Sequence, residues 1–271
     1  MPSWPPSSEA LRAAFDAPNP YAIGVEDEVM LLSPDTFDLA ERATEVLGLL
    51  DGDPRFKLEL PTSQLEILTS PVPYVTEAAA ALLLARQKLV DRAGGLVRFA
   101  AAGVHPTSPG VGTLNQVARY ERTIRDYGPI AGRQLVCALQ VHVSVGNADR
   151  ALAIYNCARS YLPLVAALAA NAPYYQGADT GLASVRPKIS ELLPRQGIPT
   201  AIESWQAHAD IFRWGATTGA FADSRTWWWE LRLHPGFGTV EFRVPDAQST
   251  VTDAAAIAAV AQALVAWLGE R

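Results

Sequence analysis

The chain has 271 residues, of which 49% are hydrophobic and 18% charged, a composition typical of a folded globular protein and unlike that of a disordered chain. Its 22 basic and 28 acidic residues give a net charge of -6, which argues against nucleic acid binding as the main function. No low-complexity segment divides the sequence, so we expect residues 1–271 to form one domain.

The sequence also predicts a cytoplasmic protein that lies outside any membrane. The Pro/Ser-rich N-terminal stretch lacks the basic and apolar regions of a signal peptide. Later apolar segments carry polar interruptions, and we expect none of them to span a bilayer. Cys137 and Cys157 have neither CxxC spacing nor a flanking histidine, which is typical of reduced thiols.

The first predicted strand carries consecutive acids. A helix is predicted at 8–15, and residues 21–32 then form an apolar run that contains Glu26, Asp27 and Glu28. Strand alternation places Glu26 and Glu28 on one face. If that face points into a cleft, the two carboxylates require a neutralising cation, and a divalent metal is the simplest one. If the strand lies at a sheet edge, the same face is wet and no metal is needed.

The next predicted elements bring further carboxylates to strands. A helix at 41–50 precedes strands at 56–60 and 64–68, which carry Glu59 and Glu66. An Ala/Leu-rich helix at 76–94 and a strand at 96–104 follow. Taken alone, Glu59 is interpreted equally well as a surface acid on a short strand.

A histidine lies in a later apolar strand. Residues 116–127 predict a charged helix, and residues 134–146 a strand with Gln140, His142 and Ser144 on one face. An isolated histidine in such a run is more often a core residue that hydrogen bonds the backbone than a ligand. A long helix is predicted at 148–169.

The C-terminal part contains a polar loop and a hairpin. Residues 171–186 predict either a functional loop or a flexible spacer, and a helix follows near 202–212. Strands at 228–233 and 239–244 predict a hairpin in which Glu241 and Arg243 share one face, about 7 Å apart. Arg243 alone could equally pair with a nearby acid. The last predicted element is an Ala-rich helix at 251–268.

Together the polar residues of these strands form a ligand set. Carboxylates with one imidazole suit Mg²⁺ or Mn²⁺, whereas structural zinc favours thiolates. Magnesium beside an arginine is common where phosphoryl groups are transferred. The set comprises Glu26, Glu28, Glu59, Glu66, His142 and Glu241, with Arg243 as a fixed cation.

Several motifs in series resemble the glutamate–cysteine ligase type 2 family, and within it the YbdK-like carboxylate–amine ligases. They follow the family order along about the whole chain: residues 24–28 (GVEDE), 127–137, 140–143 (QVHV), 171–186 and 239–246 (TVEFRVPD). The resemblance implies an α+β, glutamine-synthetase-like fold, in which a curved, mostly antiparallel sheet has helices packed on its outer face.

The resemblance also implies an ADP-forming reaction. ATP phosphorylates a glutamate-like carboxylate, and an amine then displaces phosphate to form an amide, with weak glutamate–cysteine ligase activity as one form of the reaction. The expected cofactors are ATP and Mg²⁺ or Mn²⁺, and the expected partners are a small-molecule carboxylate and an amine, without nucleic acid or membrane. Pairing of sheet edges is compatible with a homodimer.

Matched position by position, the resemblance assigns metal binding to Glu26, Glu28, Glu59, Glu66, His142 and Glu241. It assigns catalysis to Glu241 and Arg243, and substrate or nucleotide binding to Asn171, Thr180, Arg186 and Arg243. The chain is shorter at its C-terminus than is usual in the family. Two alternatives therefore stay open: a non-catalytic relative that binds nucleotide or amino acid, and a small-molecule phosphotransferase.

Overall fold

An antiparallel sheet forms the centre of the computed structural model, which describes residues 4–16, 20–221, 223 and 226–271. Within these residues, the strand order is β2-β3-β1-β5-β9-β8, and β4 pairs with the distal half of β1. The strands are β1 Ile23–Leu32, β2 Phe56–Leu58, β3 Gln64–Leu68, β4 Arg98–Ala100, β5 Leu139–Ser144, β8 Leu231–His234 and β9 Thr239–Phe242. A separate small hairpin joins β6 Tyr174–Tyr175 to β7 Ala178–Asp179.

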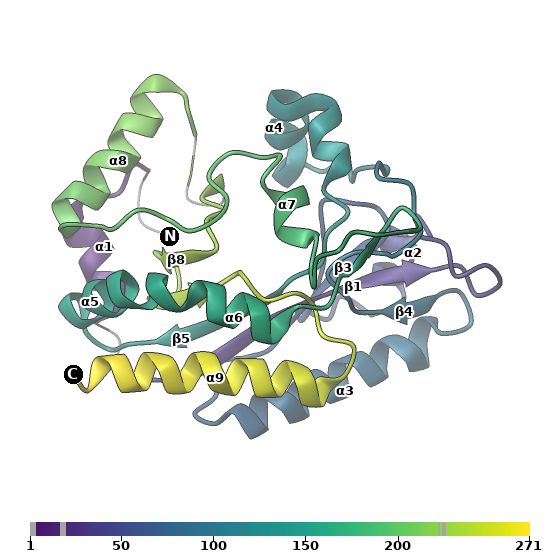
Figure 1. Cartoon of the computed structure of the whole chain (residues 1–271), viewed down its shortest axis with the longest axis horizontal. Coiled ribbons are helices and arrows are strands. Elements are labelled where there is room, and N and C mark those ends of the chain that lie inside the picture. The colour runs from purple at the N-terminus through teal and green to yellow at the C-terminus, as the bar shows by residue number, and fades with distance from the viewer. Residues whose placement is uncertain (1–3, 17–19, 222, 224–225) are drawn as a thin grey trace.

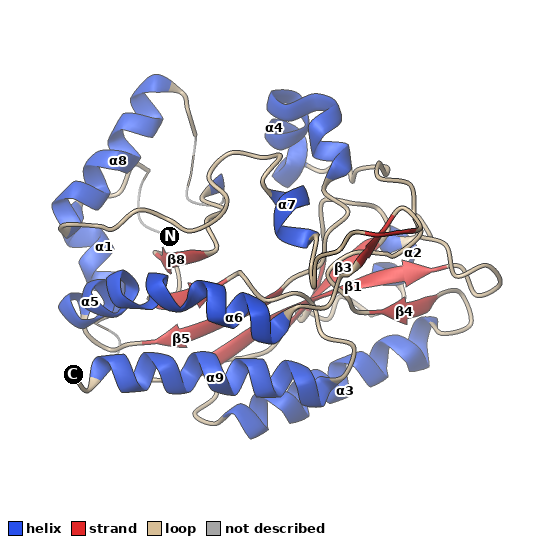
Figure 2. Ribbon diagram, viewed as in Figure 1, coloured by secondary structure: helices blue, strands red, loops and turns tan. Residues whose placement is uncertain are grey.

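Helices cover one face of the sheet and leave the other to the cleft described below (Figures 1 and 2). The helices are α1 Ser8–Phe15, α2 Ala43–Gly48, α3 Val75–Ala93, α4 Ala118–Tyr127, α5 Ala148–Ala158, α6 Leu162–Ala169, α7 Arg186–Ser190, α8 Trp205–Thr218 and α9 Val251–Gly269, with 3₁₀ turns at Gly128–Arg133 and Arg159–Tyr161. In Figure 1, α3 and α9 lie along one side of the sheet, and α4 and α7 stand on the opposite side.

The alternation of β1 explains this division of faces. Ile23, Val25 and Val29 are buried and belong to the main hydrophobic core. Asp27 shares their face, and α3 neutralises it, because Arg86 donates hydrogen bonds of 2.9 and 3.0 Å to its two carboxylate oxygens. The helix-covered face is therefore apolar apart from one satisfied ion pair, and the remaining acids of β1 lie on the other face.

Two predicted elements differ from the structure for local chemical reasons. The strand predicted at 134–146 begins only at Leu139, because the backbone N–H of Ala138 donates to the carboxylate of Glu28 instead of to a neighbouring strand. The helix predicted at 148–169 is divided into α5 and α6 by a 3₁₀ turn. Pro163 lies in the first turn of α6, where its missing N–H is tolerated.

We expected no segment long and apolar enough to cross a membrane, but two helical segments meet the criteria of length and hydropathy. Residues 148–169 have a mean hydropathy of 1.2, and 33% of their most apolar stretch is buried. Val251–Gly269 has a mean hydropathy of 1.7, and 28% of its most apolar stretch is buried. Core helices of soluble proteins pass the same test. Both segments contribute buried side chains to the main core, so we assign no membrane span to them.

A buried histidine packs among aromatic rings beside the sheet. The ring of His208 on α8 lies 4.5 Å from that of Phe212 and 6.2 Å from that of Trp227, and the residue is 1% exposed. Neither ring nitrogen has a hydrogen-bond partner among the described residues. Burial lowers the pKa of His208 from 6.5 to about 4, because charging the ring in apolar surroundings is unfavourable.

We expect His208→Leu to raise the free energy of unfolding by about 1–3 kcal/mol, since it removes a buried polar group that has no partner. The wild-type protein also loses stability as pH falls from 6.5 towards 4, because His208 of the unfolded chain binds a proton before His208 of the folded protein does. The variant should therefore also lose stability less steeply over that interval. Urea unfolding at pH 7 and pH 5 measures both effects.

The matched control is His105→Leu. His105 is also buried, but its Nδ1 accepts hydrogen bonds from the backbone N–H of Thr107 and Ser108, and its Nε2 lies 2.9 Å from the carbonyl oxygen of Phe37. This substitution should destabilise the protein, because it leaves those groups unpaired. Equal destabilisation by both substitutions would contradict the interpretation of His208.

Candidate active site

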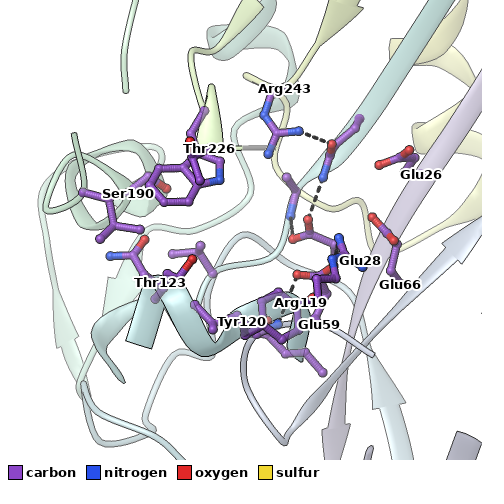
Figure 3. A pocket seen from close by; sticks show the side chains of 18 of the residues that line it. Glu26, Glu28, Glu59, Glu66, Arg119, Tyr120, Thr123, Ser190, Thr226 and Arg243 are labelled. Carbon is purple, nitrogen blue, oxygen red and sulfur yellow. Dashed lines mark hydrogen bonds and ion pairs between the residues drawn. The ribbon is translucent and has the colours of Figure 1, made fainter. Parts of the chain in front are cut away.

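A cleft of about 740 Å³ opens over the sheet face that is free of core helices. Its floor carries acids from β1 and β3, and its walls include α4, α7 and the β8–β9 hairpin. Figure 3 shows Glu26, Glu28, Glu59 and Glu66 gathered on one side of the cleft, with Arg243 above them and α4 below. Of the two alternatives left open for the acidic strand, the structure shows the central one, because β1 lies between β3 and β5.

Strand register places the acids side by side. Glu28 is directly opposite Glu66 of β3, and Glu26 is opposite Gln140 of β5. His142 in turn is opposite Glu241 of β9. Directly opposed residues in antiparallel strands have Cβ atoms about 5 Å apart, so the register brings one continuous polar row across three strand boundaries.

The first cluster in this row consists of Glu28, Glu59 and Glu66. One carboxylate oxygen from each residue lies within 4.8 Å of one from each of the others. Burial and the charge of Glu59 raise the pKa of Glu28 to about 8, and burial with the neighbouring charges raises the pKa of Glu66. The protein alone does not supply enough positive charge to keep all three carboxylates ionised, because like charges repel each other in a buried position.

Glu28 is nevertheless held in one orientation. Its Oε2 accepts a 2.7 Å hydrogen bond from the backbone N–H of Ala138, and its Oε1 accepts one of 2.8 Å from the side-chain amide of Gln140. Each oxygen has a second lone pair that these bonds do not use. Glu59 has a looser partner, because its Oε1 lies 3.8 Å from a guanidinium nitrogen of Arg119 on α4.

The second cluster consists of His142, Glu26 and Glu241. The Nε2 atom of His142 lies 3.3 Å from Glu26 Oε1 and 3.9 Å from Glu241 Oε1, and although it is buried, no described residue forms a hydrogen bond with it. The other ring nitrogen, Nδ1, lies 2.9 Å from the hydroxyl of Thr239. The His142 ring is therefore oriented from behind, while Nε2 points between two carboxylates.

The first cluster meets the distance requirement of a divalent cation site, and the donor types of the second also suit one. An imidazole nitrogen without a hydrogen-bond partner between two carboxylates, and three carboxylates within reach of one point, are hard donor sets suited to Mg²⁺ or Mn²⁺. The contact of Nδ1 with Thr239 corresponds to the outer partner that usually orients a metal-binding histidine. The alternative that His142 is a core residue satisfied by backbone is not supported, because Nε2 has no such bond.

Two arginines hold Glu241 on the cleft side of β9. Glu241 is 0% exposed, and Arg243 donates a 2.6 Å hydrogen bond to its Oε1 while Arg232 of β8 donates to its Oε2. Arg243 also donates to the side-chain oxygen of Gln140. Burial raises the pKa of Glu241, but the arginines and His142 outweigh it and hold that pKa well below its ordinary value. Glu241 is thus a permanent anion that fixes two cations beside the acid clusters.

The predicted loop residues are placed differently. Arg186 lines the cleft but is buried in an ion pair with Asp246, to which its Nε donates at 2.7 Å. The side-chain amide of Asn171 donates to the carbonyl oxygen of Ala247, and the hydroxyl of Thr180 donates to that of Pro173. Neither Asn171 nor Thr180 is among the described residues that line the cleft.

The structure adds site residues that sequence reasoning missed. Gln140, Arg232 and Glu230 line the cleft beside the predicted residues. A signal for Arg232 was present, since residues 231–234 (LRLH) alternate apolar and polar side chains as the ligand strands do. The partner of Arg232 could not be predicted, because it depends on the β8–β9 register.

Comparisons with known proteins agree with this geometry. Residues 22–271 match the model of the family described as glutamate-cysteine ligase family 2. A protein of Rubrobacter xylanophilus, provisionally named glutamate–cysteine ligase 2-3, is 38% identical over 263 residues, which cover 94% of this chain and 72% of the relative. A provisionally named glutamate–cysteine ligase 2-1 of Frankia casuarinae is 32% identical over 265 residues, or 94% of this chain and 69% of that protein.

Solved structures share the fold at low sequence identity. The glutamate–cysteine ligase of Francisella tularensis, solved in complex with AMP, superposes with a TM-score of 0.66 at 12% identity over 93% of this chain and 67% of its own. The bifunctional glutathione synthetase of Pasteurella multocida gives 0.61 at 14% identity over 95% of this chain and 40% of its own. They confirm the predicted α+β, glutamine-synthetase-like fold. The chain belongs to glutamate–cysteine ligase family 2, a family of carbon–nitrogen ligases.

Proposed function

We propose that the protein is an ADP-forming carboxylate–amine ligase that uses ATP to activate a glutamate-like acid as an acyl phosphate. The observation that carries this proposal is the polar row across the sheet, where two incomplete acid clusters lie beside a fixed arginine pair. Phosphoryl transfer between ATP and a carboxylate brings several negative charges together, and divalent cations held by such a row would compensate them together with the arginines. An amine then displaces phosphate and forms the amide.

The metal ligands in this proposal are those of the two clusters. Glu28, Glu59 and Glu66 would hold one divalent cation, and Glu26, His142 and Glu241 a second. Mg²⁺ or Mn²⁺ bound there would neutralise phosphate oxygens and orient the transferred group. The fit rests on the buried Nε2 of His142 without a hydrogen-bond partner and on the close approach of the three carboxylates.

The chain's own residues would supply positive charge beside the phosphoryl group and limit the access of water to it. Arg243 and Arg232 present fixed guanidinium groups beside Glu241, where they can contact a transferring phosphoryl group. Residues of α4 and α7 line the cleft, and in Figure 1 these helices stand on the side of the sheet opposite α3 and α9. Figure 3 shows Arg119, Tyr120 and Ser190 of these helices around the cleft. Such a lining reduces hydrolysis of an acyl phosphate, which water would otherwise consume.

Several further expectations belong to the same proposal. The described sheet is continuous from β2 to β8, which supports one catalytic domain over residues 1–271. We propose small-molecule partners, a glutamate-like acid and an amine, and a cytoplasmic location. Cys137 and Cys157 both carry free thiols, in keeping with that location.

The decisive experiment measures ADP and phosphate release from Mg-ATP with glutamate and a panel of amines that includes cysteine. Release that depends on the amine would establish the ligase. Accumulation of a stable phosphorylated product without an amine would indicate a phosphotransferase instead. Nucleotide binding without any release would indicate a non-catalytic relative.

We also expect the stabilising effect of Mg²⁺ to grow with pH. The pKa of Glu28 is raised from 4.5 to about 8 by burial and by Glu59, so the metal-free fold loses stability as pH rises through that interval. Bound metal would remove this loss, because it replaces the protons. Thermal unfolding at pH 5 and pH 8, with MgCl₂ or with NaCl at equal ionic strength, should show the larger Mg²⁺ shift at pH 8. An equal shift at both values would contradict the assignment.

A further inference from the structure

A buried carboxylate beside the arginine pair has no role in the clusters described above. Glu230 immediately precedes β8, and its carbonyl oxygen accepts a 2.9 Å hydrogen bond from the backbone N–H of Arg243. It therefore lies opposite Arg243 and on the same strand face as Arg232 and His234, which also line the cleft. The residue is only 5% exposed.

The carboxylate of Glu230 lacks the bonds that a buried anion normally has. Its Oε2 is buried without a hydrogen-bond partner among the described residues. Among the described residues Arg186 forms an ion pair with Glu230, but its Nη2 lies 3.7 Å from Oε2, beyond hydrogen-bond distance. An anion in this position is costly unless a ligand or solvent supplies N–H or O–H donors.

Arg186 does not need Glu230 to be satisfied. Its Nε donates to Asp246 at 2.7 Å, and its Nη2 donates to the carbonyl oxygens of Val244 and Arg243. One guanidinium thus lies between two carboxylates, Asp246 and Glu230, and this group carries one excess negative charge. The ion pair between Arg186 and Glu230 lacks a direct hydrogen bond, so Oε2 of Glu230 keeps its capacity to accept one.

The chemistry around Glu230 favours an ammonium group over a metal ion. A hard divalent cation requires several oxygen ligands, whereas the described residues bring one buried carboxylate oxygen without a hydrogen bond, that of Glu230, to this part of the cleft. A primary ammonium carries a single charge and three N–H donors, which match one carboxylate with free lone pairs.

We propose that Glu230 binds the primary ammonium group of a substrate. The inference rests on the proposed function, in which this group has two sources: the α-ammonium of a glutamate-like acid or the amine that is to be acylated. Both substrates must approach the phosphoryl group that Arg243 contacts, and Glu230 lies opposite Arg243 across the hairpin. The carboxylate would then select substrates that carry an ammonium group, whereas the arginines and the proposed metal ions would bind phosphate.

The first test measures binding and requires no turnover. Methylammonium chloride is titrated into the wild-type protein, Glu230→Gln and the exposed control Glu203→Gln, with thermal unfolding as the readout and NaCl as the salt control. We expect methylammonium to stabilise the wild type and the control, and its apparent affinity to fall about 30-fold in Glu230→Gln. Glu230→Asp, which keeps the charge, should retain part of the effect. Equal responses of wild type and Glu230→Gln, including no response in either, overturn the proposal.

The second test identifies the source of the ammonium group by turnover. Wild type and Glu230→Gln are compared with glutamate against glutarate, which lacks the α-ammonium, and with ammonium against hydroxylamine, a neutral nucleophile at neutral pH. Loss of the preference for glutamate assigns Glu230 to the acid, and loss of the preference for ammonium assigns it to the amine. If both preferences are unchanged, Glu230 does not bind a substrate ammonium. If the wild type turns over nothing but still binds methylammonium through Glu230, the ligase proposal fails and the ammonium site stands.

Discussion

Replacing Glu28 with glutamine is expected to lower amine-dependent ADP formation about 1000-fold while the protein stays folded. The carboxylate of Glu28 faces Glu59 and Glu66, and the amide that replaces it has the same size but no charge. A neutral amide is a poor ligand for a hard cation, so the first cluster would lose its metal. The stabilising effect of Mg²⁺ on thermal unfolding should fall in parallel.

The metal-free Glu28→Gln protein should lose less stability than the wild type between pH 4.5 and pH 8, because an amide has no proton to lose where burial and Glu59 raise the pKa of Glu28. Glu203→Gln provides the matched control, since Glu203 is exposed and far along the chain from either cluster. Assays at saturating and limiting Mg²⁺ separate weak metal binding from slow chemistry. Unchanged magnesium dependence in Glu28→Gln would remove Glu28 from the ligand set.

Much of this cleft follows from strand periodicity. Alternation alone places Glu26 and Glu28 on one face of β1, and Gln140 and His142 on one face of β5, and the structure confirms both pairs. Strand boundaries were predicted less well than strand faces. Ala138 shows why: its backbone N–H bonds a side chain from a strand far away in the sequence, and no local pattern reports such a contact.

What sequence reasoning could not supply is the neighbour of each polar residue. The pairing of Arg232 with Glu241 depends on the register of β8 against β9. Oε2 of Glu230 lacks a hydrogen bond among the described residues because Arg186 donates to Asp246 instead.

Asn171 and Thr180 show that a motif does not report what a side chain contacts. Asn171 donates to the carbonyl oxygen of Ala247, 76 residues further along the chain, and Thr180 donates to that of Pro173. Their assignment to substrate or nucleotide stays a prediction.

Arg243 is bonded to both parts of the polar row. It donates hydrogen bonds to Glu241 and Gln140, and its pKa is raised because the attraction of Glu241 outweighs burial. Gln140 also holds Glu28, so Arg243 is connected through one amide to the first acid cluster. Under the proposed function, a change at this arginine would reach both the phosphoryl contact and the orientation of Glu28.

Arg243→Lys is expected to lower kcat about 1000-fold, because an ammonium cannot reproduce the planar, multiply bonded guanidinium. Glu241 keeps its ion pair with Arg232, so the variant should fold and retain most of its Mg²⁺-dependent stabilisation. Arg213→Lys, at an exposed position on α8, is the matched control. A loss confined to the KM for ATP, with kcat unchanged, would show that Arg243 binds the ground state and contributes nothing specific to the transition state. Retention of both constants would remove Arg243 from the catalytic residues and leave Arg232 as the cation that faces the transferring phosphoryl group.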